Sequence, residues 1–316
     1  MKKLFIILAL ISILDANAQN IDRKVLLNDI ELLSSDKYEG RKTGSRGNFM
    51  AAEYIINRFK ENGLEAYNKD FKHPFTFKNR RNEEINGVNL IGYIKGRSDQ
   101  VIVISAHYDH VGIKNGEIYN GADDDGSGTV ALLEIAQAFA QAKKEGHGPK
   151  RSILFLHVTG EEHGLHGSRF YSENPLFPLA NTVADVNIDM IGRRDEAHAN
   201  SNNYVYIIGS DYLSSDLYTI CEETNKKHIH LDLDYTYNDR KDPNRFYYRS
   251  DHYNFAKNGI PSVFLFNGTH ADYHKATDEV EKIEFDALAK RTRYAFAIAW
   301  EIANRENRLI IDKDGK

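Results

Sequence analysis

Residues 101–110 read VIVISAHYDH, a continuous apolar run that ends in two histidines and an aspartate. A short apolar run rich in β-branched side chains predicts a strand that is buried on both faces. Strands of this kind belong to parallel sheets with helices on both sides, and such sheets bind ligands at the carboxyl ends of their strands. The run therefore predicts a fold class and also places His107, Asp109 and His110 where a site is expected.

The same alternation of apolar runs and helical periodicity continues along the chain. The predicted strands cover residues 88–94, 101–105, 153–158, 183–188, 204–208 and 263–266. The predicted helices cover residues 21–35, 45–62, 132–139 and 285–299. Strands that alternate with helices favour an α/β fold, a three-layer sandwich with a central, largely parallel mixed sheet and helices on both faces.

The first 18 residues have the three-part layout of a secretory signal peptide. Lys2 and Lys3 precede an apolar run at residues 4–14, and Ala16-Asn17-Ala18 supplies the small residues of a cleavage site. The apolar run is too short to span a bilayer comfortably. We therefore expect export to the periplasm or the medium, removal of residues 1–18, and a single domain over residues 19–316 without membrane attachment.

Charge and cysteine content narrow the classes of function. The formal net charge is −5, and lysines and arginines are scattered, so nothing in the charge pattern favours nucleic acid as a partner. Cys221 is the only cysteine, which excludes an internal disulfide and a cysteine-based zinc site. Any metal ion must therefore be held by histidine, aspartate and glutamate.

Acids and histidines gather in five clusters beside the predicted strands and helices. The clusters read SAHYDH (105–110), NGADDDGSG (120–128), TGEEHG (159–164), NIDM (187–190) and HADYH (270–274). Each cluster alone has an ordinary explanation, because acids often face solvent or cap helices. Several carboxylates at one sheet edge would nevertheless repel one another unless cations neutralised them. Oxygen and imidazole ligands without thiolate suit zinc or a similar divalent ion.

In this order, the runs SAHYDH, GADDDGSG, GEEHGLHGS, NIDM and DYHKATDE resemble the metallopeptidase family of bacterial two-zinc leucyl-type aminopeptidases. Glutamate carboxypeptidase and glutaminyl cyclase are relatives of that family. The resemblance extends over about residues 30–300. It implies a zinc-dependent exopeptidase of the aminopeptidase type, which hydrolyses N-terminal residues from peptides through a hydroxide shared by two zinc ions.

The resemblance also assigns metal ligands. His107 and Asp189 would bind one zinc ion, Glu162 and His274 would bind the other, and Asp124 would bridge the two. The family pattern further implies that the peptide bond that follows Asp124 is cis. Three other histidines compete as ligands but are expected to lie outside the metal pair: His110, His163 and His166.

Three further residues receive roles from the same resemblance. Glu161 would be the general base, Asp109 would fix the ring of His107, and Tyr273 would stabilise the oxyanion. The run Arg249-Ser250-Asp251-His252 also resembles a family motif near the substrate, to which we assign no role. The polar and aromatic segment 224–248 is expected to be a loop at the substrate site.

Three alternatives remain open at this point. A glutaminyl cyclase has the same fold and would hold one zinc ion, although Ser127-Gly128 resembles the peptidase form of the loop. A carboxypeptidase for acidic peptides would need arginines, and Arg240, Arg245 and Arg249 could supply them. A receptor-like binding protein would have lost its site, whereas here all five expected ligands and the base are present.

Overall fold

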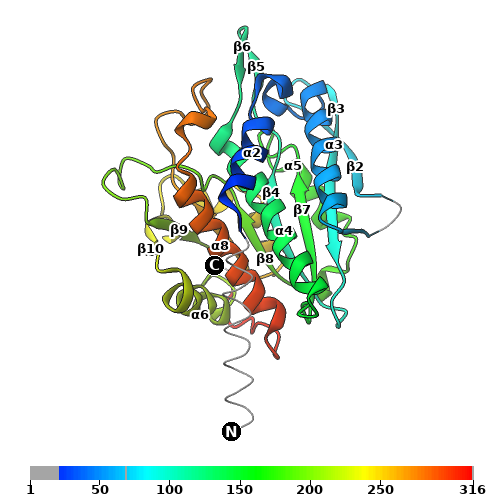
Figure 1. Cartoon of the computed structure of the whole chain (residues 1–316), viewed down its shortest axis with the longest axis vertical. Helices are drawn as coiled ribbons and strands as arrows, with labels where there is room; N and C mark the ends of the chain where they lie inside the picture. The colour runs from blue at the N-terminus through cyan, green and yellow to red at the C-terminus, as the bar shows by residue number, and fades with distance from the viewer. Residues whose placement is uncertain (1–20, 68–69, 315–316) are drawn as a thin grey trace.

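A computed structural model of the chain describes residues 21–67 and 70–314, so the predicted signal peptide lies outside the described residues. One nine-stranded sheet forms the centre, in the order β1-β3-β7-β4-β8-β11-β9-β10, with β2 paired to β3 (Figure 1). The strands β7, β4, β8 and β11 are parallel neighbours. The flanking strands β3 and β9 run antiparallel to them. The predicted mixed, largely parallel sheet is confirmed.

The sheet contains more strands than the apolar runs predict. Its members are β1 (Glu65–Ala66), β2 (Lys72–Lys78), β3 (Glu84–Ile94), β4 (Val101–His107), β7 (Ser152–Val158), β8 (Thr182–Ile188), β9 (Tyr204–Ile208), β10 (Asp232–Asp234) and β11 (Ser262–Phe266). A separate hairpin consists of β5 (Gly112–Lys114) and β6 (Glu117–Tyr119). The strands without a predicted counterpart lie at the sheet margins or in the hairpin, where half-exposed residues give no continuous apolar run.

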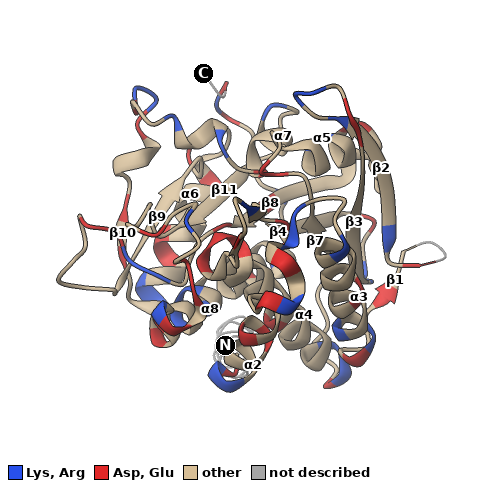
Figure 2. Ribbon diagram, turned by 90° about the horizontal axis from the view of Figure 1, so that it is seen from above, with Lys and Arg blue, Asp and Glu red and all other residues tan. Residues whose placement is uncertain are grey.

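Helices cover both faces of the sheet. They are α2 (Arg23–Leu33), α3 (Arg46–Glu61), α4 (Gly128–Lys144), α5 (His166–Glu173), α6 (Ser215–Thr224), α7 (His252–Ala256) and α8 (Phe285–Asn304). Figure 2 shows α5 and α7 on one side of the strands and α2, α3, α4 and α8 on the other. Lysines, arginines and acids alternate along the outer helices in that view. Among the described residues, no helix is both long and apolar enough to cross a membrane.

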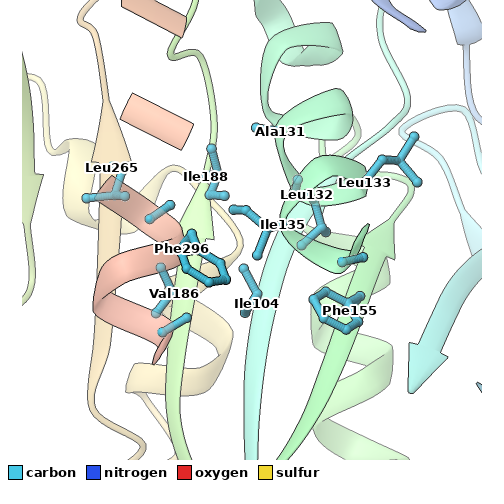
Figure 3. Close-up of a cluster of buried hydrophobic side chains, with 14 of the residues drawn as sticks. Ile104, Ala131, Leu132, Leu133, Ile135, Phe155, Val186, Ile188, Leu265 and Phe296 are labelled. Carbon is cyan, nitrogen blue, oxygen red and sulfur yellow. The ribbon is translucent and has the colours of Figure 1, made fainter. Parts of the chain in front are cut away.

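Alternate residues of the strands pack into separate cores. On β4, Ile102 and Ile104 face α4 and α8, whereas Val101 and Val103 belong to the cluster on the α5 and α7 side. Figure 3 shows how Leu132 of α4 and Phe296 of α8 meet Ile104 on the first of these faces. This two-residue period explains why the central strands are apolar throughout, because both faces are covered.

Local signals in the sequence account for the ends of α3. The Ser45 side chain accepts a hydrogen bond from the backbone N–H of Asn48, which caps the first turn. At the other end, Gly63 has a φ of 73°, a left-handed conformation that glycine adopts without steric cost. Both ends lie within one residue of the predicted helix 45–62.

Candidate metal centre

The parallel strands end at one edge of the sheet and bring the five clusters together. His107 is the last residue of β4, and its register partner Val158 ends β7, three residues before Glu161. Asp189 directly follows β8, and His274 lies in the loop after β11. Backbone direction alone thus places these side chains near one another, as expected for the carboxyl edge of a parallel sheet.

The three consecutive aspartates of the turn before α4 have different contacts. Asp125 accepts hydrogen bonds from the backbone N–H groups of Gly128 and Met190, at 2.9 and 3.0 Å. Asp123 accepts one from the backbone N–H of Gly192 at 2.6 Å. Asp123 also contacts His270, whereas Asp124 turns its carboxylate toward His107 and His274. The peptide bond between Asp124 and Asp125 is cis, as the family pattern implies.

Two buried groups fix this turn from outside. Arg41 is fully buried and donates hydrogen bonds to the carbonyl oxygens of Asn120 and Gly121, at 2.6 and 2.8 Å. Asp278 accepts from the backbone N–H of Asp124 at 3.1 Å. At Gly128, an added Cβ would lie 2.4 Å from the Asp125 carboxylate, so no larger residue fits there. Arg41 lies in none of the predicted clusters, and Asp278 lies in the run DYHKATDE but received no role there. The contacts that give both residues this function span up to about half the sequence.

One group of ligand atoms forms around His107. Its Nε2 lies 3.4 Å from Asp124 Oδ1 and 3.5 Å from Asp189 Oδ1. Its Nδ1 lies 3.0 Å from the backbone carbonyl oxygen of Asp109, and this contact orients the ring and leaves Nε2 toward the two carboxylates. The second oxygen of Asp189 accepts a 2.6 Å hydrogen bond from Ser250. Ser250 belongs to the motif that received no role from the sequence.

A second group forms around the other oxygen of Asp124. His274 Nε2 lies 3.0 Å from Asp124 Oδ2 and 3.1 Å from Glu162 Oε2. His110 enters the same group, with its Nδ1 2.9 Å from Glu162 Oε1 and 3.8 Å from Asp124 Oδ2. The two oxygens of Asp124 therefore face two different groups of ligand atoms, which is the arrangement of a bridging carboxylate.

The structure separates the three rival histidines. His110 is buried, and neither of its ring nitrogens makes a hydrogen bond within the described residues. His166 instead stacks on Phe77 with ring centroids 4.0 Å apart, and His163 packs against the same ring at 5.6 Å. The expectation that all three lie outside the metal pair stays a prediction, and His110 is the one of them that lies beside the expected ligands Asp124 and Glu162. The sequence spacing could have suggested it, since His110 follows His107 by three residues in one loop.

The donor set fits zinc. Ligands of a tetrahedral zinc ion lie about 2.0–2.1 Å from the metal, which puts neighbouring ligand atoms about 3.3 Å apart. The contacts of His107 Nε2 with the two carboxylates, at 3.4 and 3.5 Å, match this spacing. In addition, the buried atoms Asp124 Oδ2 and Glu162 Oε1 make no hydrogen bond among the described residues. A cation would satisfy these lone pairs, and buried polar atoms are rarely left without a partner.

Charge interactions show how strongly the site demands positive charge. Burial raises the pKa of Asp124, but the nearby imidazole groups of His110, His107 and His274 outweigh burial and hold this pKa well below its usual value. Burial lowers the pKa of His274, yet the close carboxylates of Asp124 and Glu162 prevail and raise it to about 10. Divalent cations supply such charge without protonating the imidazoles.

Glu161 differs from its neighbour Glu162. Its carboxyl group lines the cavity at the site and makes no ion pair within the described residues. Burial and repulsion by Glu162 and Asp189 raise its pKa well above the usual value. Its backbone N–H donates to Asp109 Oδ1 at 3.3 Å, so the Asp109 carboxylate supports the loop that carries both glutamates. Adjacent residues thus point one carboxylate at the histidines and the other at the cavity.

The cavity has a volume of about 30 Å³ and joins the histidines and acids to an aromatic wall. Its lining residues are His107, Asp124, Glu161, Asp189, Met190, Phe246, Arg249, Phe264, Phe266, Tyr273 and His274. Tyr273 stacks on His274 with ring centroids 4.0 Å apart. Phe246 comes from the segment 224–248, which also contains β10 and is therefore only partly a loop.

Comparisons with known proteins agree with this geometry. The model of a family described as "Peptidase family M28" matches residues 89–299. Leucine aminopeptidase 1 of Penicillium rubens is 26% identical over 298 residues, which cover 90% of this chain and 73% of the relative.

Two solved structures share the fold. A zinc aminopeptidase from Bacillus subtilis superposes with a TM-score of 0.72 at 16% identity, covering 91% of this chain and 97% of the other. A glutaminyl cyclase from Porphyromonas gingivalis gives a TM-score of 0.70 at 17% identity, covering 88% and 97%. At these identities the likeness concerns the fold alone.

Proposed function

The chain belongs to peptidase family M28, and we propose that it is a zinc-dependent aminopeptidase that removes N-terminal residues from peptides. The observation that carries this proposal is the position of the Asp124 carboxylate. Its two oxygens face two separate groups of histidine and carboxylate ligands. The relatives named leucine aminopeptidase support the choice of an aminopeptidase.

The proposed ligands would hold two zinc ions per chain. His107 and Asp189 would take one ion, Glu162 and His274 would take the other, and Asp124 would contribute one oxygen to each. The position of His110 beside Glu162 supports its inclusion as a further ligand of the second ion. Zinc bound by these residues would supply Lewis-acid chemistry, which activates water and polarises a carbonyl group.

The residues around the ligands carry the proton and orient the substrate. Glu161 accepts a proton from the attacking water and passes it to the leaving amine, as its place on the cavity wall allows. Tyr273 lies beside His274 and donates a hydrogen bond to the oxygen that becomes negatively charged. Asp109 positions two parts of the site. Its backbone carbonyl oxygen contacts His107 Nδ1, and its carboxylate accepts a hydrogen bond from the backbone N–H of Glu161.

Several features outside the site belong to the same proposal. Export of the protein with removal of residues 1–18 is supported by the charged start and apolar run of the sequence. The mature chain, residues 19–316, would then act as a single domain in the periplasm or the medium. Phe246 in the cavity wall supports the view that segment 224–248 contributes to the substrate site. Sequencing the N-terminus of exported protein tests the first point, with Gln19 as the expected first residue.

Metal stoichiometry and substrate blocking test the proposed function together. Fully loaded protein should contain two zinc ions per chain and hydrolyse leucine p-nitroanilide. It should also cleave a free Leu-Gly dipeptide but not acetyl-Leu-Gly, because the acetylated form has no N-terminal amine. One tightly bound ion together with cyclisation of N-terminal glutamine would instead identify a glutaminyl cyclase. Cleavage of acetyl-Leu-Gly would identify a carboxypeptidase.

A further inference from the structure

An arginine lies at the cavity where the sequence predicts mainly acids. Arg249 lines the same cavity as His107, Glu161 and Asp189. It is the only lysine or arginine among the described residues that do so. Every other charged lining group is a histidine or a carboxylate, so Arg249 is the one permanent cation that the protein offers to a substrate.

The position of this arginine is fixed from both sides. The Arg249 guanidinium carbon lies 4.7 Å from the ring centroid of Phe246, which is buried against Phe266 at 5.0 Å. The next residue, Ser250, donates a hydrogen bond to Asp189. The backbone of Arg249 is therefore tied to a predicted metal ligand, and its side chain lies along the aromatic wall.

The donors of this guanidinium are largely uncommitted. Its two hydrogen bonds within the described residues, to the Asn244 carbonyl oxygen and the Tyr273 hydroxyl, are both 3.4 Å long. No carboxylate of the described chain forms an ion pair with it. Arg193, by contrast, pairs with Asp272 at 3.0 Å. An arginine that is held at a cavity with free donors is suited to bind a planar anion such as a carboxylate.

We propose that Arg249 binds a carboxylate group of the peptide substrate and thereby selects short peptides, above all dipeptides. This proposal rests on the proposed aminopeptidase function. One extended residue spans at most about 3.3–3.6 Å, so the terminal carboxylate of a dipeptide lies within one residue of the scissile bond.

The carboxylate that Arg249 binds could be the C-terminus of the peptide or an acidic side chain on the residue after the scissile bond. Different substrates can distinguish these two sources of the carboxylate. We would measure kcat/KM of the zinc-loaded enzyme for Leu-Gly, Leu-Gly-amide and Leu-Glu-amide. The variants are Arg249→Met, which keeps the aliphatic stem on Phe246, and Arg249→Lys, which keeps the charge without the planar fork. Arg240→Met is the matched control, because Arg240 also stacks on an aromatic ring, that of Tyr212 at 4.3 Å, but does not line the cavity.

Wild-type enzyme should prefer Leu-Gly over Leu-Gly-amide by on the order of 10-fold, the effect of one charge-assisted hydrogen-bonded pair. Arg249→Met should abolish the preference, Arg249→Lys should retain part of it, and Arg240→Met should leave it unchanged. A preference for Leu-Glu-amide that depends on Arg249 would support carboxylate binding and assign it to the side chain.

Two failures are distinguishable. Cleavage of Leu-Gly, Leu-Gly-amide and Leu-Glu-amide at equal rates, or a preference that survives in Arg249→Met, would overturn this inference and leave the aminopeptidase intact. Absence of cleavage of all three substrates and of leucine p-nitroanilide by zinc-loaded wild type would overturn the proposed function itself. Thermal unfolding of each variant, compared with wild type, excludes misfolding as the cause of a lost preference.

Discussion

The structure contains one cluster of buried carboxylates between helices and another at the carboxyl edge of the sheet, and the two are neutralised differently. Between α2, α3 and α4, Asp29 and Glu134 share Arg58, which lies 3.1 Å from Asp29 Oδ2 and 3.6 Å from Glu134 Oε1. At the carboxyl edge of the sheet, Asp124 and Glu162 face histidines, and within the described chain no lysine or arginine forms an ion pair with either.

The difference separates a structural cluster from a functional one. A buried acid that only holds helices together is provided with a cation by the protein itself, because an unpaired buried charge is costly. Within the described chain, Asp124 and Glu162 at the sheet edge have no lysine or arginine partner of this kind and contact only histidines. The natural occupant of that edge is therefore a cation from outside the chain, and perturbing the two clusters should have different consequences.

The largest effect is expected from the two adjacent glutamates at the sheet edge. Glu161→Gln keeps the size of the side chain but removes the proton acceptor, so kcat should fall by about 10²–10⁴-fold with zinc content unchanged. Glu162→Gln replaces an anionic ligand by a neutral one, so bound zinc should fall and activity should partly return with excess metal. Kinetics and elemental analysis of both variants test this, and zinc loss in Glu161→Gln alone would reverse the two roles.

Removing the cation of the structural cluster should cost stability without affecting the metal site. Arg58→Met leaves Asp29 and Glu134 buried without their partner, and the free energy of unfolding in urea should fall by about 3–5 kcal/mol. Zinc content per folded chain should stay that of wild type. A chelator should destabilise wild type and variant by the same increment, because distant perturbations add. A loss of zinc in Arg58→Met would contradict the separation of the clusters.

Replacing histidines near the carboxyl edge of the sheet tests which of them bind the metal. His110→Asn should weaken zinc binding at the second position by about 10–100-fold, as found when a group that supports a metal is lost. His163→Asn is the matched control and should leave affinity unchanged, since His163 packs on Phe77 instead. Competition of each variant with a zinc chelator of known affinity measures this effect. Equal affinities would show that His110 does not bind the metal.

The smallest effect concerns pH and Glu134. Burial raises the pKa of Glu134 to about 7, above its ordinary value of 4.5. Between these two values the folded chain keeps a proton that the unfolded chain has released, so this residue's contribution to stability is lost as pH rises through about 7. Relative to wild type, Glu134→Gln should therefore gain about 1–2 kcal/mol between pH 5 and pH 7. Urea unfolding at both pH values tests the sign, and a constant difference would contradict it.

Much of the fold follows from sequence patterns because the central strands are buried on both faces. The apolar runs of β4, β7, β8, β9 and β11 are continuous for that reason, and each was predicted to within one or two residues. Strands β2 and β10 escaped prediction because one side of each is exposed. Their pairing depends on a neighbouring strand that is already in place, which no local pattern reveals.

The sequence also determined which residue types meet at the carboxyl edge, because strand direction alone brings the ends of parallel strands together. The five predicted ligands lie there with Glu161 and Tyr273 beside them. What only the tertiary structure decided is the direction of each side chain. It joins the carboxylates of Asp123 and Asp125 to backbone N–H groups, turns His110 inward, and stacks Arg249 on Phe246. These choices depend on long-range contacts such as those of Arg41 and Asp278, and a linear pattern does not contain them.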